Sequence, residues 1–258
     1  MRTNTVLEAW RAGRQTVGAW LTVESSFNAE AMAHVGFDWL CIDMQHGVID
    51  YAGSVTMMQA ISTTATVPFV RVPWNDAATI MRALDGGASG VVVPLVNNGE
   101  EAARAVAACR YPPNGIRSSG PARARLVNGD DYVDAANPEV ACIVMIETAE
   151  AIEKLDEILA TPGVDAAYIG PADLAFALGL PGHGDNPHPR HLETVTRIIE
   201  ACKRHGVVAG IHTGSVAYTQ KYLDMGFQMV TLGMDMNFMT ARATADLGAV
   251  RRSDGTGS

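Results

Sequence analysis

Short apolar runs rich in β-branched residues alternate along the chain with longer amphipathic stretches, and Gly, Pro, Asn or Asp marks most junctions. This alternation predicts repeated βα units. We expect eight strands, at residues 16–23, 37–44, 67–73, 90–96, 140–147, 164–170, 207–213 and 228–233. Most of these runs are apolar nearly throughout, as parallel strands covered on both faces are. Eight units in about 250 residues predict an α/β fold of the (β/α)8 TIM barrel type, with a doubly wound open sheet as the alternative.

The same series sets the expected domain organisation. We expect a single barrel domain over residues 1–250 and a disordered tail at 251–258, where the sequence reads RRSDGTGS. The longest stretches that we expect to be irregular are residues 112–137 and 171–190.

Composition narrows the class of ligand. The chain has 258 residues, 48% of them hydrophobic, and a formal net charge of −9 at pH 7. Nucleic acids are bound chiefly through clustered Lys and Arg, so this charge argues against a nucleic-acid partner and favours a small metabolite. No stretch approaches the roughly 18 apolar residues of a membrane span, and the N-terminus lacks an apolar signal segment. The four cysteines form no CxxC pair, which is typical of reduced thiols, and we expect a soluble cytoplasmic protein.

Polar side chains stand at the carboxyl ends of several predicted strands. In a barrel of this kind, catalytic groups lie where the strands run into the following loops. The residues at these positions are Asp43, Gln45, His46, Arg71, Glu147, Asp173, His212 and Asp235. We therefore expect them to share one end of the barrel.

Two of these residues, Glu147 and Asp173, follow neighbouring strands, so their carboxylates can converge at the barrel mouth. No Cys or paired His stands beside them, and an all-oxygen ligand set suits Mg²⁺, Mn²⁺ or a similar ion. The alternative for each residue is a role as a helix N-cap, with Asp173 capping a turn that begins at Leu174. The two carboxylates together favour a metal site.

Arg71 and His46 are the candidate catalytic groups. Arg71 lies in the otherwise apolar run VPFVRVPWND, and a buried guanidinium needs a negative partner. That partner is either a substrate oxygen or, as the alternative, one of the two carboxylates in an internal ion pair. His46 can act as a base or proton shuttle near neutral pH. His212 is a weaker candidate, as are the histidines of HGDNPHPRH, which we expect to be a surface loop.

The positions of the lysines bear on the mechanism. Enolate chemistry on a 2-oxo acid uses either a Schiff-base lysine or a metal ion. Lys154, Lys203 and Lys221 all fall in predicted helices, away from the strand ends. The sequence therefore favours a metal.

Taken together, six motifs resemble those of the HpcH/HpaI family of class II pyruvate aldolases, in order over roughly residues 16–240: IDMQHG, VRVPWND, LDGGASGVVVP, YPPNGIR, MIET and IGPADLAFALG. The resemblance implies a barrel of the phosphoenolpyruvate/pyruvate superfamily that cleaves 4-hydroxy-2-oxo acids into pyruvate, or a related donor such as hydroxypyruvate, and an aldehyde. It also implies a divalent cation, Mg²⁺, Mn²⁺ or Co²⁺, and commonly a homohexamer with exchanged C-terminal helices.

The resemblance also implies roles around the donor. Glu147 and Asp173 would be the metal ligands, the backbone around Ala172 and Asp173 would hold the substrate carboxylate, and Asp43 would support a bound water. One departure concerns Met145, which stands where the family generally has a Gln that contacts the oxo-acid donor. This change puts the donor preference in question.

Further implied roles concern proton transfer and charge. Arg71 would stabilise the enolate or the new alkoxide, and His46 would transfer a proton, tuned by Asp85. The usual acid before this histidine is Gln45 here. Asp85 lies near the end of a predicted helix, on the opposite face of the barrel from His46, so we expect the pair to form between subunits. The alternative is a local role, such as a salt bridge with Arg82.

Two other functions compete with the aldolase. A citrate-lyase-type enzyme acting on an acyl-CoA thioester would need basic residues for the CoA phosphates, which Arg117, Arg123 and Arg125 could supply. A non-catalytic barrel that binds oxo acids is the second alternative. The set of polar residues at the strand ends favours an enzyme over that second reading.

Overall fold

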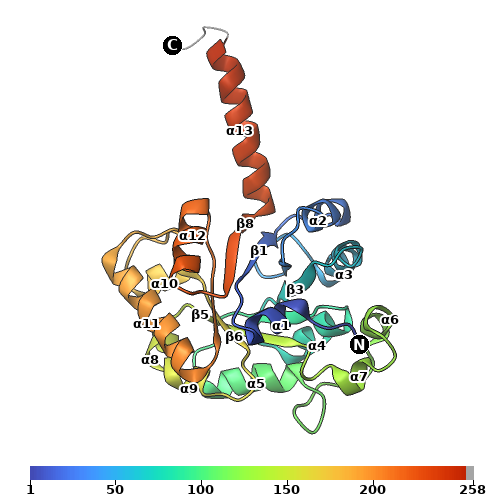
Figure 1. Ribbon diagram of the computed structural model, residues 1–258. Helices are drawn as coiled ribbons and strands as arrows, with labels where there is room; N and C mark the ends of the chain where they lie inside the picture. The colour runs from blue at the N-terminus through green and yellow to red at the C-terminus, as the bar shows by residue number, and fades with distance from the viewer. Residues whose placement is uncertain (254–258) are drawn as a thin grey trace.

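Eight parallel strands form a closed barrel in the computed structural model, which describes residues 1–253 (Figure 1). The strands are β1 (Thr16–Leu21), β2 (Trp39–Asp43), β3 (Val67–Arg71), β4 (Gly90–Val93), β5 (Ala141–Ile146), β6 (Ala166–Ile169), β7 (Val208–Ile211) and β8 (Met229–Met234). Seven of them lie inside the predicted ranges, and β8 ends one residue later than expected. Because β8 pairs with β1, the barrel is confirmed and the open sheet is excluded.

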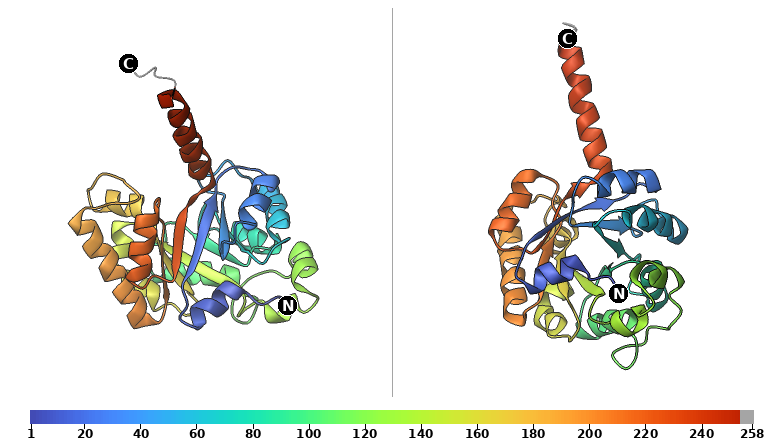
Figure 2. Two further views of the ribbon diagram at one scale, coloured as in Figure 1. Left: turned by 45° about the horizontal axis from the view of Figure 1, so that its top comes forward. Right: turned by 45° about the vertical axis from the view of Figure 1, so that its right-hand side comes forward.

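Helices cover the outside of the barrel and link successive strands (Figure 2). They are α1 (Thr5–Arg11), α2 (Ser26–Ala33), α3 (Tyr51–Ile61), α4 (Ala77–Asp85), α5 (Gly99–Cys109), α6 (Ala122–Asn128), α7 (Tyr132–Ala135), α8 (Ala149–Glu153), α9 (Leu155–Leu159), α10 (Pro171–Ala177), α11 (Pro189–His205), α12 (Val216–Asp224) and α13 (Asp235–Ser253). The prediction of irregular structure at 112–137 and 171–190 was wrong in part, because α6, α7 and α10 lie there. These helices are short, and short segments give a weak periodic signal.

The core has two layers, as expected for strands that are buried on both faces. Aliphatic side chains fill the space between strands and helices, and a second cluster with many aromatic side chains fills the barrel interior. Helix α1 closes the amino-terminal end of the barrel, where Trp10 packs against Phe69 with ring centroids 6.1 Å apart. All four cysteines are buried and unpaired.

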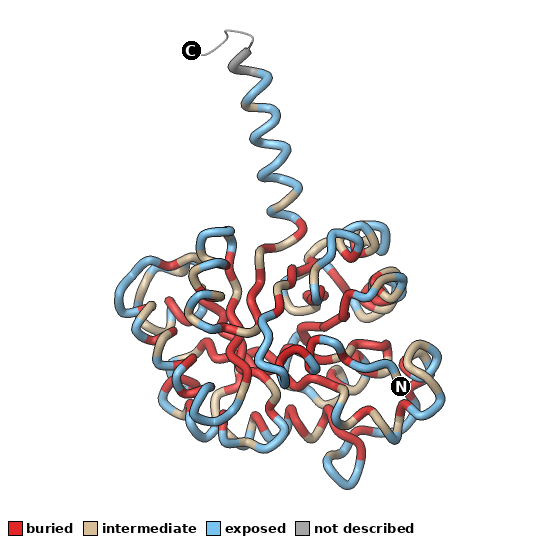
Figure 3. The backbone as a smooth tube through the Cα atoms, viewed as in Figure 1, coloured by how far each residue is buried: buried red, intermediate tan, exposed pale blue. Residues whose placement is uncertain are grey.

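Helix α13 leaves the barrel and projects away from it (Figures 1 and 2). Most of the helix is exposed (Figure 3), including the apolar side chains of Met239 and Leu247. Of the tail predicted at 251–258, the first three residues continue α13, and residues 254–258 lie outside the described part of the chain. None of the helices within residues 1–253 combines the length and apolar character required to cross a membrane.

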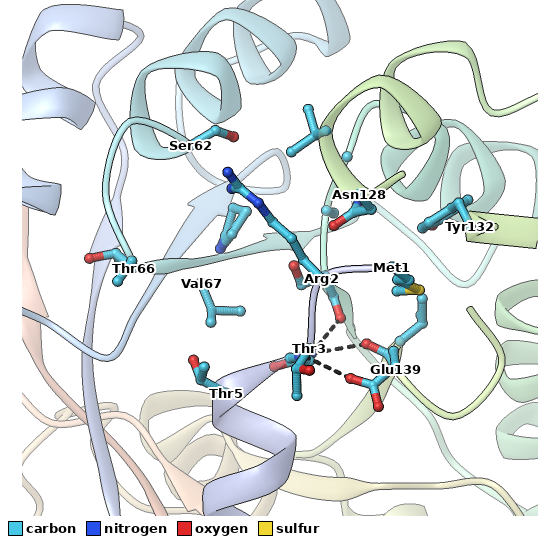
Figure 4. Close-up of a pocket in the computed structure, with 18 of the residues that line it drawn as sticks. Met1, Arg2, Thr3, Thr5, Ser62, Thr66, Val67, Asn128, Tyr132 and Glu139 are labelled. Carbon is cyan, nitrogen blue, oxygen red and sulfur yellow. Dashed lines mark hydrogen bonds between the residues drawn. The ribbon is translucent and has the colours of Figure 1, made fainter. Parts of the chain in front are cut away.

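A cavity of about 340 Å³ lies at the amino-terminal end of the barrel, beside the starts of β3 and β4 (Figure 4). Thr66, Val67, Asn128, Tyr132 and Glu139 are among the residues around it. In βα barrels this end contributes to stability, whereas the chemistry is located at the other end. None of the predicted catalytic or metal-binding residues lines this cavity.

Candidate active site

A larger cavity, of about 670 Å³, opens at the carboxyl ends of the strands. Six of the predicted site residues line it: Asp43, His46, Arg71, Met145, Ala172 and Asp173. The structure therefore brings most of the predicted site together at the expected end of the barrel.

Arg71 and Asp43 form a two-point ion pair at the base of this cavity. They are direct partners in the β2–β3 register, so their side chains leave the sheet side by side. Nε of Arg71 lies 2.9 Å from Oδ1 of Asp43, and Nη2 lies 2.6 Å from Oδ2. Burial opposes ionisation of Asp43, but the hydrogen bonds and charge of Arg71 hold its pKa below the usual value. The buried partner of Arg71 is therefore Asp43, and neither Glu147 nor Asp173 pairs directly with it.

Asp43 also fixes the start of the following loop. Its Oδ1 accepts hydrogen bonds from the backbone N–H groups of Gln45, at 3.0 Å, and His46, at 3.2 Å. His46 itself is exposed at the rim of the cavity. The carboxylate thus connects the buried guanidinium to the backbone that carries the histidine.

Glu147 follows β5 directly and is only 3% exposed. Its Oε1 accepts the backbone N–H of Leu95 at 2.9 Å. Leu95 has φ 54°, a left-handed conformation that is unusual for a residue other than glycine. Strained backbone of this kind persists where the surrounding structure requires it, and it is often found at functional sites.

Burial raises the pKa of Glu147 to about 7, and the nearby charge of Asp173 acts in the same direction. Gly170 follows β6 at the level of Glu147, and a Cβ atom at this position would collide with Oε2. Any larger residue here would displace the carboxylate of Glu147 from its position.

Neither carboxylate is a helix cap, so that alternative was wrong for both. Thr148 caps α8 through its side chain, and Gly170 is the N-cap residue of α10. Asp173 lies inside the first turn of α10, where it is exposed and lines the cavity. Both acids remain available for another partner.

Their environment fits a divalent cation. A buried carboxylate beside a second acid carries excess negative charge, which a cation would neutralise, and two oxygen ligands leave room for water and substrate. Within residues 1–253, no three His, Cys, Asp or Glu side chains are grouped so as to hold a metal ion by themselves. Glu147 and Asp173 by themselves could therefore supply only part of a coordination shell.

Asp85 does not reach His46 within this chain. It ends α4 outside the cavity, and its Oδ1 accepts a hydrogen bond from Nη2 of Arg117 at 2.8 Å. The predicted alternative of a bridge to Arg82 was wrong, because Arg82 lies over the ring of Tyr51. Arg117 comes from the segment expected to be irregular, so no sequence pattern pairs it with Asp85.

Several residues of the cavity were missed or ranked low. His212 lines it, and its Nδ1 lies 3.3 Å from the hydroxyl of Tyr168. Asp185 also lines it, although HGDNPHPRH was predicted to be a surface loop. The position of His212 at a strand end was an available signal, whereas no pattern placed Asp185. Asp235, which was selected by position, instead accepts hydrogen bonds from the segment that follows β1.

The family model for HpcH/HpaI aldolase/citrate lyase matches residues 16–241. The chain belongs to this family. A relative named 4-hydroxy-2-oxo-heptane-1,7-dioate aldolase, from Klebsiella pneumoniae, is 40% identical over 246 residues, which are 94% of this chain and 92% of the relative. An HpcH/HpaI aldolase/citrate lyase family protein from Burkholderia cenocepacia superposes with a TM-score of 0.91 at 35% identity, covering 96% of this chain and all of that one.

A third similar structure is that of the citrate synthase SbnG, with a TM-score of 0.86 and 26% identity, covering 96% of this chain and 98% of that one. This HpcH/HpaI chain is an enzyme of the aldolase, or aldehyde-lyase, type. The arginines considered for CoA phosphates do not support the citrate-lyase alternative. Each of them already has a partner in the chain. Arg117 is buried and forms an ion pair with Asp85, Arg123 donates hydrogen bonds to Ser62 and to the carbonyl of Gly86, and Arg125 pairs with exposed Asp130.

Proposed function

We propose that this HpcH/HpaI enzyme makes and breaks the C3–C4 bond of 4-hydroxy-2-oxo acids, joining a pyruvate-type 2-oxo acid to an aldehyde. The observation that carries the proposal is that the Arg71–Asp43 pair and Asp173 line one cavity, while buried Glu147 lies close enough to feel the charges of Asp173 and Arg71. The name of the Klebsiella relative, which refers to a 4-hydroxy-2-oxo dioate, agrees with this reaction class.

Glu147 and Asp173 would hold a divalent cation, Mg²⁺, Mn²⁺ or Co²⁺. When bound, such an ion withdraws charge from a 2-oxo acid and so makes its C3 protons more acidic. The backbone around Ala172 and Asp173, at the edge of the cavity, would receive the donor carboxylate. Because Gly170 has no Cβ atom, the carboxylate of Glu147 can occupy the adjacent space.

The chain then supplies the proton transfer and the charge stabilisation. His46, or a water that it polarises, removes a C3 proton, and the resulting carbon nucleophile attacks the aldehyde carbonyl. Two nitrogens of Arg71 are bound to Asp43, while Nη1 lies 4.0 Å from the sulfur of Met145. A thioether is a weak acceptor, so Nη1 can donate instead to the aldehyde oxygen and stabilise its negative charge.

A lysine-based mechanism finds no support in the structure. Lys154 pairs with Glu150 on the outer surface, and Lys221 lies over the rings of Tyr218 and Tyr222. Lys203 lies 3.5 Å from the carbonyl of Met225. None of the three lysines lines the larger cavity.

Chelation and trapping test the proposal. Treatment with EDTA should abolish retro-aldol activity, and Mg²⁺, Mn²⁺ or Co²⁺ should restore it. Calorimetry should detect Mn²⁺ binding to the chelator-treated wild type, and Glu147→Gln should weaken that binding by at least about tenfold because it removes a charged ligand. Glu153→Gln, at the exposed end of α8 and outside the cavity, is the matched control. Capture of a pyruvate adduct by borohydride would overturn the metal mechanism.

Assembly and location belong to the proposal too. We propose a homo-oligomer, a hexamer by family resemblance, in the cytoplasm. The exposed apolar side chains along α13 are consistent with a helix that packs against another subunit.

A further inference from the structure

One wall of the larger cavity takes no part in the proposed chemistry. It is formed where β7 ends and where the segment between α10 and α11 crosses toward it, and it contains Gly184, Asp185, His212 and Gly214. Arg71 and Asp173 line the same cavity from other strand ends, and Glu147, the second proposed metal ligand, follows β5. Because the donor is assigned to those groups, this wall is left for the aldehyde.

Asp185 is held in a defined position on this wall. Its Oδ1 accepts the backbone N–H of Gly214 at 3.0 Å, and its Oδ2 accepts the hydroxyl of Ser215 at 2.6 Å. Two contacts leave acceptor sites free on both oxygens, because a carboxylate has about four lone-pair positions. Asp185 is partly buried and lines the cavity, so these sites can accept hydrogen bonds from a ligand.

His212 is held beside it. Its Nδ1 lies 3.3 Å from the hydroxyl of Tyr168, which in turn is bonded to Thr231 and accepts Nε1–H of Trp20 at 3.1 Å. The imidazole also packs edge-on against Trp20, with ring centroids 5.4 Å apart. These contacts fix the ring and leave Nε2 as the nitrogen available to a ligand. Burial and the charge of Arg71 lower the pKa of His212 to about 4, so the ring is neutral near pH 7.

The charges around the cavity decide which aldehydes fit. Asp43, Asp173 and Asp185 all line it, whereas Arg71 is the one Lys or Arg among the described lining residues and is already paired with Asp43. A carboxylate at the far end of an aldehyde would face Asp185, and the described lining residues of this chain include no unpaired Lys or Arg to balance it. A hydroxyl group there could donate to Asp185 and bond with His212.

We propose that Asp185 and His212 form an acceptor subsite that favours neutral, hydroxyl-bearing aldehydes over acidic ones. The inference rests on the proposed aldolase function and names its substrate class. It separates this chain from the Klebsiella relative, whose name refers to a dioate, a compound with a second carboxylate.

Three acceptors test the subsite, each with pyruvate and Mn²⁺. Glycolaldehyde carries a hydroxyl group, propanal is a neutral aldehyde of similar size without one, and 4-oxobutanoate carries a carboxylate. For the wild type we expect kcat/KM for glycolaldehyde to exceed that for each of the others by about tenfold, because a polar site left unpaired discriminates strongly. Equal values for the three acceptors would overturn the inference.

Two substitutions assign the selectivity to its residues. Asp185→Asn should raise the ratio of 4-oxobutanoate to propanal by about tenfold, because it removes the repulsive charge. His212→Leu should lower the ratio of glycolaldehyde to propanal by a similar factor. Asp224→Asn, the same charge change on exposed α12, should change neither ratio. Ratios cancel any general loss of activity, so unchanged ratios in both test variants would remove these residues from the subsite.

One further measurement separates this inference from the proposed function. Exchange of the C3 protons of pyruvate with deuterium oxide reports donor activation without any acceptor. If the wild type with Mn²⁺ exchanges no protons, the proposed function fails. If it exchanges them but shows no acceptor selectivity, only the subsite fails.

Discussion

Arg71 commits two of its three guanidinium nitrogens to Asp43 and keeps Nη1 toward Met145. The planar fork of arginine allows this arrangement, whereas the ammonium of lysine is a single point charge. We expect Arg71→Lys to reduce kcat/KM by about 100-fold or more, as the loss of a preorganised charge-stabilising donor does. The measurement is the steady-state rate of retro-aldol cleavage.

The control for this variant is Arg104→Lys, on an exposed side chain next to Glu101. Circular dichroism and the melting temperature should show that both variants remain folded. A near-normal kcat/KM for Arg71→Lys would remove Arg71 from the mechanism.

Met145 is the second residue whose substitution is informative. It lines the cavity, is 2% exposed and lies two residues before Glu147, so both side chains are on the same side of the sheet. In Met145→Gln, the amide oxygen can accept a hydrogen bond from Nη1 of Arg71, and the amide nitrogen can contact the 2-oxo acid.

We expect this substitution to change the ratio of hydroxypyruvate to pyruvate turnover by about tenfold, and to change the Mn²⁺ affinity much less. Met145→Leu, an apolar replacement of similar volume, should leave the ratio near its original value. If Gln and Leu behave alike, Met145 serves only to pack the core.

The strand ends were predictable because parallel strands appear in a sequence as continuous apolar runs, and polar residues that end those runs stand out. This is how Arg71 and Glu147 were found. Their partners were not predictable in the same way. The stagger between strands decides which residue of β2 lies opposite Arg71. The alternation of residues within one strand carries no information about that stagger. Asp185 reaches the cavity through hydrogen bonds to Gly214 and Ser215, about thirty residues away, which no local pattern encodes.

His212 gives the pH dependence of stability. Its pKa is lowered from 6.5 to about 4, mainly by burial. Between these two pH values the imidazole is therefore protonated in the unfolded chain but neutral in the folded protein. The stability of the folded state should therefore fall as the pH drops from 6.5 toward 4, and be unaffected by this group above 6.5. At about pH 5 the loss should be about 2 kcal/mol.

Urea unfolding of the chelator-treated wild type and of His212→Asn measures this effect. The difference in unfolding free energy between the two proteins should shift in favour of the variant as the pH is lowered, while other titrating groups cancel. A difference that stays constant from about pH 7.5 to pH 5 would contradict the assigned role of His212.

Asp85 and His46 provide a test of the shared active site. In one chain, Asp85 is bound to buried Arg117, and His46 is exposed at the rim of the other end of the barrel. The side chain of Asp85 remains 28% exposed, so it can contact a neighbouring subunit without leaving Arg117. We predict that Asp85 acts on the partner subunit's His46 and that a single chain has an incomplete site.

Subunit mixing decides this prediction, and the choice of variants matters. Asp85→Ala would leave the Arg117 guanidinium buried without its counter-ion, at a cost of several kcal/mol, and loss of activity could then reflect unfolding. Asp85→Asn keeps a hydrogen-bond acceptor for Arg117 and removes the charge. We expect it to be inactive or nearly so, as His46→Ala should be.

The two inactive proteins are then mixed in equal amounts under conditions of subunit exchange. Each site draws one residue from each of two chains, so about a quarter of the sites should place a wild-type His46 against a wild-type Asp85. If the pair acts within one chain, every site keeps a defect and no activity returns. Native mass spectrometry should confirm that mixed oligomers form, and mixed oligomers that stay inactive would exclude a site shared in this way.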